Sequence, residues 1–266
     1  MLMSIVVLSY NRPVQVERIL KNFIGVDSSD FNIIIKDDVS PLQHEIKSLV
    51  ERYSELLDVE VVFHSNERNM GYDSNLIDSF FITDSEYVFL LSDDDYVVGA
   101  KVHSIIESIK NSQLDFYFTP YIDGDTVKRV PSGNYESDKF SDLIYNSILF
   151  SGLVYRINAV KSLTLDYEFL SKCIYSQVYL AIALIHKQKE YGVLPSEILY
   201  LGGDGDNFFG KNESASNSEL LSDRKKVYSD FIYQQFLLRV VDRISSDFCS
   251  SIRQSFYKEY SKRLIS

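Results

Sequence analysis

Three consecutive aspartates, Asp93, Asp94 and Asp95, follow the apolar run of residues 87–91 after a single serine, Ser92. Adjacent carboxylates repel one another unless a cation lies close to them. Their oxygens suit hard cations such as Mn²⁺ or Mg²⁺, which take few protein ligands and complete their coordination with substrate phosphates. A metal that bridges a diphosphate stabilises it as a leaving group. The triplet therefore indicates a metal site for a phosphorylated substrate, and the alternative is a solvated acidic turn.

The first hundred residues contain alternating strand and helix signals. Continuous β-branched and apolar runs, typical of strands buried on both faces, occur at 5–8, 31–35, 59–63 and 87–91. Helical patterns separate them at 14–23, 42–57 and 73–81. This order predicts an α/β fold with a mostly parallel sheet flanked by helices.

Polar clusters follow three of the four expected strands. In open parallel sheets, ligands bind beyond the carboxyl ends of the strands. The fold should therefore gather these clusters on one rim. They are Ser9-Tyr10-Asn11-Arg12, Asp37-Asp38 and Asp93-Asp94-Asp95.

The remainder of the chain is less regular. We expect a strand at 116–120, a turn at 123–125, helices at 141–149 and 176–186, and a glycine-rich loop at 202–207. From about residue 218 the pattern is helical. Ser245-Ser246-Asp247 predicts a break and a new helix start, so the tail should form two helices.

The charge distribution distinguishes the tail from the body of the protein. The net charge of −11 argues against nucleic-acid binding, which needs a basic surface. Residues 222–266, however, carry nine Lys or Arg against five Asp or Glu, a local charge of +4. The tail could cover an apolar face of the body or a partner, or it could make peripheral contact with anionic lipid. The side chains concerned are Arg239, Arg243, Arg253, Lys258, Lys262 and Arg263.

Other features point to an intracellular setting. The two cysteines, Cys173 and Cys249, show no pairing pattern. The first apolar run is too short for a signal peptide, and no run reaches the length of a membrane span. We therefore expect a cytoplasmic protein, with the inner face of the membrane as a further location if the tail binds lipid.

Four motifs, in order along the chain, resemble the family-2 glycosyltransferases of the GT-A fold, in particular those that make bacterial surface polysaccharides. They are residues 6–12, the Asp-Asp-x-Ser segment at 35–40, the Asn-x-Gly stretch at 66–75, and the DxD element at 92–95. The resemblance covers about residues 4–100. It implies a GT-A domain over 1–217, with a donor half (1–113) and an acceptor half (114–217), and a helical extension over 218–266.

The resemblance also implies an activity and a set of site residues. The protein would transfer a sugar from a nucleoside-diphosphate donor to a saccharide acceptor, which could be lipid-linked. Tyr10 would pack on the nucleotide base and Asp38 would contact it. Asp94 and Asp95 would bind Mn²⁺ or Mg²⁺. The full donor-binding set would be Ser9, Tyr10, Asn11, Arg12, Asp38, Asn69, Gly71, Asp73 and Asp93.

The catalytic base is where this chain departs from the family. Inverting members place an acidic residue at the start of a helix near two-thirds of the chain, where this sequence has Ser176 and Gln177. Neither side chain is a base near neutral pH. Still expecting an inverting enzyme, we place the base at Asp204 or Asp206. Glu168 and Asp166 come next. Alternatively, the glycine-rich loop only shapes the acceptor pocket, or the stereochemical course differs.

Two other functions compete with transfer. A nucleotidyltransferase would carry a glycine- and arginine-rich loop after its first strand, and residues 9–13 contain no glycine. A noncatalytic protein that binds a sugar nucleotide or a partner transferase would account for the missing acid near Ser176.

Overall fold

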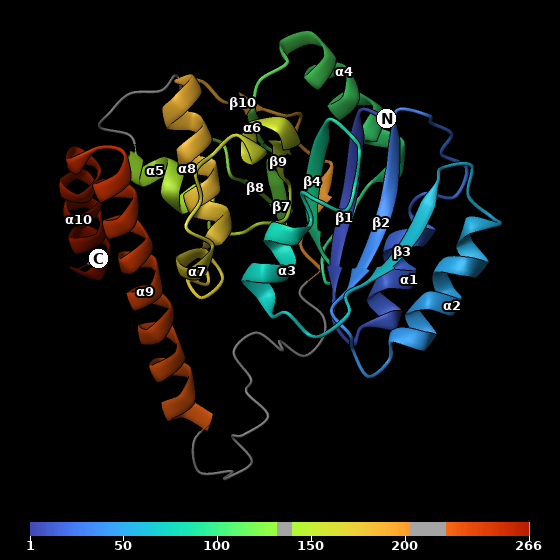
Figure 1. Cartoon of the computed structure of the whole chain (residues 1–266), viewed down its shortest axis with the longest axis horizontal. Coiled ribbons are helices and arrows are strands. Elements are labelled where there is room, and N and C mark those ends of the chain that lie inside the picture. The colour runs from blue at the N-terminus through green and yellow to red at the C-terminus, as the bar shows by residue number, and fades with distance from the viewer. Residues whose placement is uncertain (132–139, 203–221, 266) are drawn as a thin grey trace.

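The protein is built around a seven-stranded sheet (Figure 1), seen in a computed structural model that describes residues 1–131, 140–202 and 222–265. The strand order is β10-β6-β9-β4-β1-β2-β3. The strands are β1 (Met3–Ser9), β2 (Phe31–Asp37), β3 (Val61–Ser65), β4 (Tyr87–Ser92), β6 (Phe116–Phe118), β9 (Leu153–Arg156) and β10 (Gly192–Val193).

The sheet is mostly parallel, as the alternation of elements predicts. β1 pairs in parallel with β2 and β4, and β2 pairs in parallel with β3. Only β9 runs antiparallel to its neighbours, β4 and β6. Every residue of β1 and β2 is buried, which explains their continuous apolar character.

Helices cover both faces of the sheet (Figure 1). Because successive side chains of a strand point to opposite faces, Ile5 and Val7 pack with α1, α2 and α4, whereas Val6 and Leu8 pack with α3, α5, α6 and α8. The helices are α1 (Pro13–Lys21), α2 (Gln43–Ser54), α3 (Tyr72–Asp78), α4 (Val102–Ser112), α5 (Phe140–Asn146), α6 (Ile157–Lys161), α7 (Tyr167–Leu170) and α8 (Ser176–Gln188), with a 3₁₀ turn at Gly99–Lys101.

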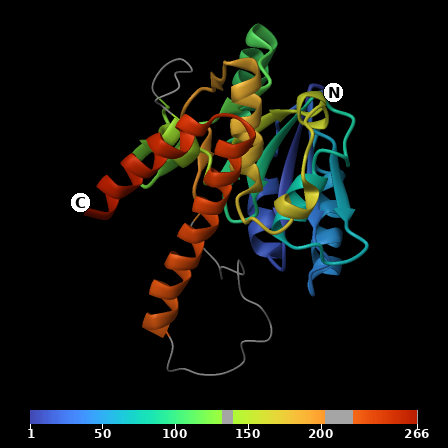
Figure 2. The same ribbon diagram turned by 60° about the vertical axis from the view of Figure 1, so that its left-hand side comes forward.

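The tail forms two helices, as predicted, α9 (Ser222–Asp247) and α10 (Ser250–Ile265). They contact each other, and α9 packs against α8 whereas α10 packs against α5 (Figures 1 and 2). Val240, Ile244 and Phe256 are fully buried and belong to the core on that side of the sheet. The tail therefore covers an apolar face of the body. Among the described residues, no helix is both long and apolar enough to cross a bilayer.

A second, smaller sheet was not predicted. Its order is β5-β11-β7-β8, and it includes a hairpin at the predicted turn near Gly124. Two of these strands contain only two residues, too few for a periodic pattern to be recognised. Its strands are β5 (Tyr96–Val97), β7 (Tyr121–Asp123), β8 (Thr126–Lys128) and β11 (Leu199–Tyr200).

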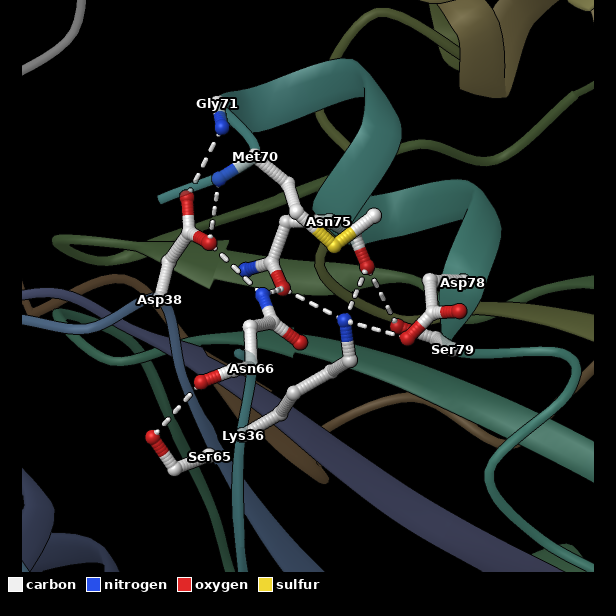
Figure 3. Close-up of polar contacts among 9 residues, drawn as sticks. All are labelled: Lys36, Asp38, Ser65, Asn66, Met70, Gly71, Asn75, Asp78 and Ser79. Atoms are coloured by element: carbon white, nitrogen blue, oxygen red, sulfur yellow. Dashed lines mark hydrogen bonds and ion pairs between the residues drawn. The ribbon is translucent and has the colours of Figure 1, made fainter. Parts of the chain in front are cut away.

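A fully buried lysine in the middle of the fold ties α3 to β2. Lys36 lies on β2 with no exposed surface, and its Nζ donates to the backbone carbonyl of Asn75 at 2.8 Å and to the Asn75 side chain. Its charge is balanced by Asp78, 3.1 Å away (Figure 3). Burial lowers the pKa of Lys36, and the nearby Asp78 opposes that effect. A buried cation of this kind persists only while its partners stay in place.

We expect Lys36→Met to lower the free energy of unfolding by about 3 kcal/mol, because the uncharged side chain fills the same space but removes the cation that Asp78 pairs with and leaves the Asn75 carbonyl with the Ser79 hydroxyl alone. Urea unfolding followed by circular dichroism measures this difference. The matched control is Lys47→Met on α2, whose exposed ion pair with Glu51 should contribute less than about 0.5 kcal/mol. Equal losses in the two variants would contradict a structural role for Lys36.

Candidate functional site

The carboxyl ends of β1, β2 and β4 meet at one rim, as predicted. Backbone hydrogen bonds join the loops that follow them: the Asp38 N–H donates to Ser9 O at 3.2 Å, and the Asp93 N–H donates to Leu8 O at 3.3 Å. The chain turns sharply at Asn11, whose φ of 63° lies in the left-handed region that asparagine tolerates better than most residues. This turn leads directly into α1, with Pro13 in its first turn.

Arg12 connects the first and last of these loops. Its guanidinium Nη1 lies 2.9 Å from Asp93 Oδ1 and 3.1 Å from Asp94 Oδ2, and the Tyr10 N–H donates to the other oxygen of Asp93 at 3.0 Å. Burial alone would lower the pKa of Arg12, but the charges of Asp93 and Asp94 outweigh it and raise that pKa. Arg12 therefore remains a cation and partly neutralises the aspartate cluster.

The three aspartates have different environments. Asp93 and Asp95 are buried, and burial raises the pKa of each to about 6, against the lowering effects of Arg12 on Asp93 and of Ser151 on Asp95. Asp94 is the most accessible, with 36% of its side chain exposed. Its charge is incompletely compensated by Arg12, which it shares with Asp93.

The aspartates fit a metal that binds few protein ligands. The described part of the chain contains no group of three His, Cys, Asp or Glu side chains arranged to hold an ion. Arg12 nevertheless pairs with two carboxylates at once, those of Asp93 and Asp94, so this hard-oxygen cluster carries more negative charge than that one guanidinium balances. A divalent cation with one or two carboxylates, completed by substrate phosphate, meets that description.

Asp38 holds the loop that precedes α3 (Figure 3). Its carboxylate accepts hydrogen bonds from the side chain of Asn66 at 2.6 Å and from the N–H groups of Met70 and Gly71 at 2.8 and 2.9 Å. Gly71 has a φ of +75°, a conformation that side-chain-bearing residues rarely adopt. Asn69 lies in the same loop and its Oδ1 accepts from the Gly71 N–H at 3.1 Å.

Asp73, predicted to border the donor, is as buried as Asp38 and Asp93. It is buried in the first turn of α3, and its carboxylate accepts hydrogen bonds from the N–H groups of Ile174 at 2.6 Å and Ser176 at 3.2 Å. Burial raises the pKa of Asp73, although these hydrogen bonds oppose the effect. The contact fixes the start of α8 to the start of α3.

The candidate bases are differently placed. Ser176 and Gln177 are buried at the start of α8, and the amide of Gln177 donates to Ile148 O at 2.7 Å. Asp166 caps α7 and pairs with Arg243 at 2.9 Å. Glu168 is exposed and pairs with Lys172 at 3.6 Å. Asp204 and Asp206 lie outside the described residues.

Two buried cations near the rim were missed by sequence reasoning. Lys36 could have been noticed as a lone charge in an apolar strand. Arg129 could not, because it follows an exposed hairpin strand. Its guanidinium is buried, donates to the carbonyls of Leu149 and Ser151, and lies 4.9 Å from the ring centre of Tyr121. Burial lowers the pKa of Arg129 to about 10, and the nearby charge of Asp95 opposes that effect.

This architecture, a mostly parallel sheet between helices with a carboxylate cluster at its rim, is the GT-A fold of glycosyltransferases. Residues 4–162 match the family Glycosyl transferase family 2, and the chain belongs to that family. An uncharacterized glycosyltransferase of Haemophilus influenzae is 28% identical over 120 residues, which make up 45% of this chain and 38% of that protein. The chain thus spans well under two thirds of this relative.

Solved structures share the fold at low sequence identity. S. aureus TarS in complex with UDP-GlcNAc gives a TM-score of 0.65 at 16% identity, over 96% of this chain and 70% of that chain. Glucosyl-3-phosphoglycerate synthase from Mycobacterium tuberculosis, with Mn²⁺, UDP and phosphoglyceric acid, gives 0.55 at 13% identity, over 91% and 78%. The mannosyltransferase PcManGT from Pyrobaculum calidifontis, with GDP-Man and Mn²⁺, gives 0.53 at 12% identity, over 73% and 55%.

Energetic coupling between Arg12 and Asp93 can be measured with a double-mutant cycle. Arg12→Met should lower the free energy of unfolding by about 3 kcal/mol, because it leaves a buried carboxylate without its counter-charge. Adding Asp93→Asn should restore part of that loss, with a coupling energy of about 2 kcal/mol in urea unfolding. If the two single effects simply add in the double variant, the ion pair does not hold the rim together.

Proposed function

We propose that the protein transfers a sugar from a nucleoside-diphosphate donor to a saccharide acceptor during synthesis of a bacterial surface polysaccharide. The observation that carries this proposal is the rim, where Arg12, Asp38 and the aspartate cluster are joined by hydrogen bonds and ion pairs across three strand ends. Membership of glycosyl transferase family 2 supports it. So do fold relatives whose structures contain UDP-GlcNAc or GDP-Man.

The donor would lie across the three loops. In this proposal Tyr10 packs on the nucleotide base and Asp38 contacts it, while Asp38 also orders the loop at Met70 and Gly71. Arg12 holds Asp93 in place beneath the ribose and diphosphate. The remaining donor contacts would come from Ser9, Asn11, Asn69 and Gly71. Asp73 would support these contacts indirectly, because its carboxylate fixes the start of α3 to the start of α8.

Asp94 and Asp95 are the proposed ligands of Mn²⁺ or Mg²⁺. When bound, the metal neutralises charge that develops on the departing diphosphate. Asp94 suits direct ligation because it is the most accessible of the three aspartates. Asp95 is positioned by the Gly202 N–H at 3.3 Å and by Ser151. Fold relatives crystallised with Mn²⁺ support the choice of a divalent ion.

The acceptor hydroxyl needs a base, and the start of α8 offers no carboxyl group of its own at Ser176 or Gln177. We therefore keep Asp204 or Asp206 as the base of an inverting reaction. Asp166 is less suited because it is committed to Arg243, which helps to lower its pKa after the larger effect of the Phe169 N–H. A nucleotidyltransferase is disfavoured by the family match.

Contact between the tail and a membrane has little support from the described side chains. Arg243 pairs with Asp166 and Asp247, Arg253 pairs with Asp242 at 3.1 Å, and Lys262 pairs with Glu259. Three of the six basic side chains considered for lipid contact thus pair with carboxylates of this chain. We therefore propose a cytoplasmic enzyme, in which the tail helices complete the fold.

Isothermal titration with UDP, GDP, CDP and dTDP, each with Mn²⁺ and with EDTA, tests the donor site. We expect one nucleotide to bind, and EDTA to weaken its binding at least about tenfold. Asp94→Ala should reproduce the effect of EDTA. The control is Asp84→Ala, an exposed aspartate in the loop before β4. If none of the four nucleotides binds with or without metal, the proposed donor site is wrong.

The base is tested by transfer kinetics with the nucleotide sugar identified in that titration. Asp204→Asn or Asp206→Asn should lower kcat by about 10²- to 10⁴-fold with unchanged nucleotide affinity, as expected for loss of a general base. Glu55→Gln, in an exposed carboxylate just after α2, is the control. Full activity in both loop variants would exclude this assignment, and a wild-type protein that binds nucleotide but never transfers would favour the noncatalytic alternative.

A further inference from the structure

Two tyrosines of the small sheet stack on each other beside the aspartate cluster. Tyr96, on β5, follows Asp95 directly in the chain, and Tyr200, on β11, is its partner where these two strands pair antiparallel. The two rings are nearly parallel, with an interplanar angle of 10° and ring centres 5.4 Å apart. Neither tyrosine is among the predicted site residues, because strands of two residues show no pattern in the sequence.

Arg18, on α1, links this stack to the main chain of the aspartate cluster. Its guanidinium carbon lies 5.3 Å from the ring centre of Tyr96, which makes a cation–π contact. Its Nη2 donates to the backbone carbonyl of Asp94 at 2.6 Å. The carboxylate of Asp94 accepts from the Ser92 hydroxyl and pairs with Arg12. Asp94 is therefore held at its main chain as well as at its side chain.

The same strand pair also holds Asp95. Two residues beyond Tyr200, the Gly202 N–H donates to Asp95 Oδ1 at 3.3 Å. The pair is anchored in the core, because Val97 and Leu199, which follow and precede the two tyrosines, are fully buried. A shift of β11 relative to β5 would therefore carry this donor away from Asp95.

A second arginine that contacts a tyrosine shows what is specific to Arg18. The guanidinium of Arg52 lies 5.1 Å from the ring centre of Tyr53 on α2, and it pairs with Glu17 at 2.6 Å. That contact is a surface ion pair next to a ring. The Arg18 guanidinium instead donates to the main chain of a predicted metal ligand.

We propose that Arg18, Tyr96 and Tyr200 are positioning residues for the divalent metal. Together they hold the main chain of Asp94 and Asp95 in the conformation that binds the ion. The assignment rests on the proposed function, because it takes these two aspartates as the metal ligands. Groups that orient metal ligands without touching the ion typically change metal affinity by about ten- to a hundredfold.

Arg18 carries a charge as well as a positioning contact, and the two have opposite effects on metal affinity. A guanidinium repels a cation bound nearby, so if only its charge mattered, Arg18→Met would strengthen metal binding. If Arg18 positions Asp94, the same substitution weakens metal binding. The direction of the change therefore distinguishes the two roles.

Binding of Mn²⁺ to the full chain, followed by electron paramagnetic resonance of the free ion, tests the proposal. It is measured with Mn²⁺ alone and with Mn²⁺ and each of UDP, GDP, CDP and dTDP, after subtraction of the ion bound by nucleotide alone. Arg18→Met and Tyr200→Ala should each weaken Mn²⁺ binding about tenfold. Tyr200→Phe keeps the stacked ring and should retain wild-type affinity.

Arg52→Met is the matched control, because it removes one cation and one contact with a ring from the surface of α2. It should leave Mn²⁺ affinity unchanged. Circular dichroism at the temperature of the titration establishes that each variant is folded. If Tyr200→Ala does not fold, Arg18→Met alone decides, since Arg18 is only half-buried.

The outcomes separate this inference from the proposed function. The inference alone is overturned if Asp94→Ala loses Mn²⁺ binding while Arg18→Met binds the ion as tightly as the wild type or more tightly. A folded Tyr200→Ala with wild-type affinity overturns it equally. A wild-type protein that binds no Mn²⁺ under any of these conditions, or an Asp94→Ala variant that binds it normally, contradicts the proposed metal site and the inference together.

Discussion

The burial of Lys36 is the constraint on which the rim at the carboxyl end of β2 depends. A cation without access to water must keep all of its partners, and those partners, Asn75 and Asp78, lie on α3. This requirement fixes α3 over the end of β2. The start of α3 then places Gly71, whose N–H reaches Asp38 together with that of Met70. The position of the loop at the rim is thus a consequence of satisfying one charge in the core.

A second buried cation, Arg12, joins the loops after β1 and β4, and its charge balance differs from that of Lys36. Lys36 lies among groups that balance its charge, whereas Arg12 pairs with two carboxylates, those of Asp93 and Asp94, and can balance only one of them. The first arrangement is a structural support. The second leaves one carboxylate charge uncompensated by Arg12, as expected for the cation site that we propose.

Patterns local in the sequence predicted most of the framework. The β-branched runs of β1 and β2 identified buried parallel strands, and the polar residues after them identified the rim. The interactions that could not be predicted join residues far apart: Lys36 and Asn75 are separated by 39 positions, and Asp73 and Ser176 by 103. Nothing in the sequence around Asp73 distinguishes a carboxylate that supports another helix from one that faces a ligand. The two-residue strands of the small sheet likewise depend on their neighbours.

The bonds from Asp73 to the start of α8 have a kinetic consequence for a two-substrate enzyme. They join the start of α3 to the start of α8, so the position of the loop at Gly71 and that of Tyr175 depend on each other. If two ligands each shift the equilibrium position of these helices, their binding free energies are coupled, and each ligand changes the affinity of the other by the same factor. The contact between α3 and α8 would then influence the order in which donor and acceptor bind.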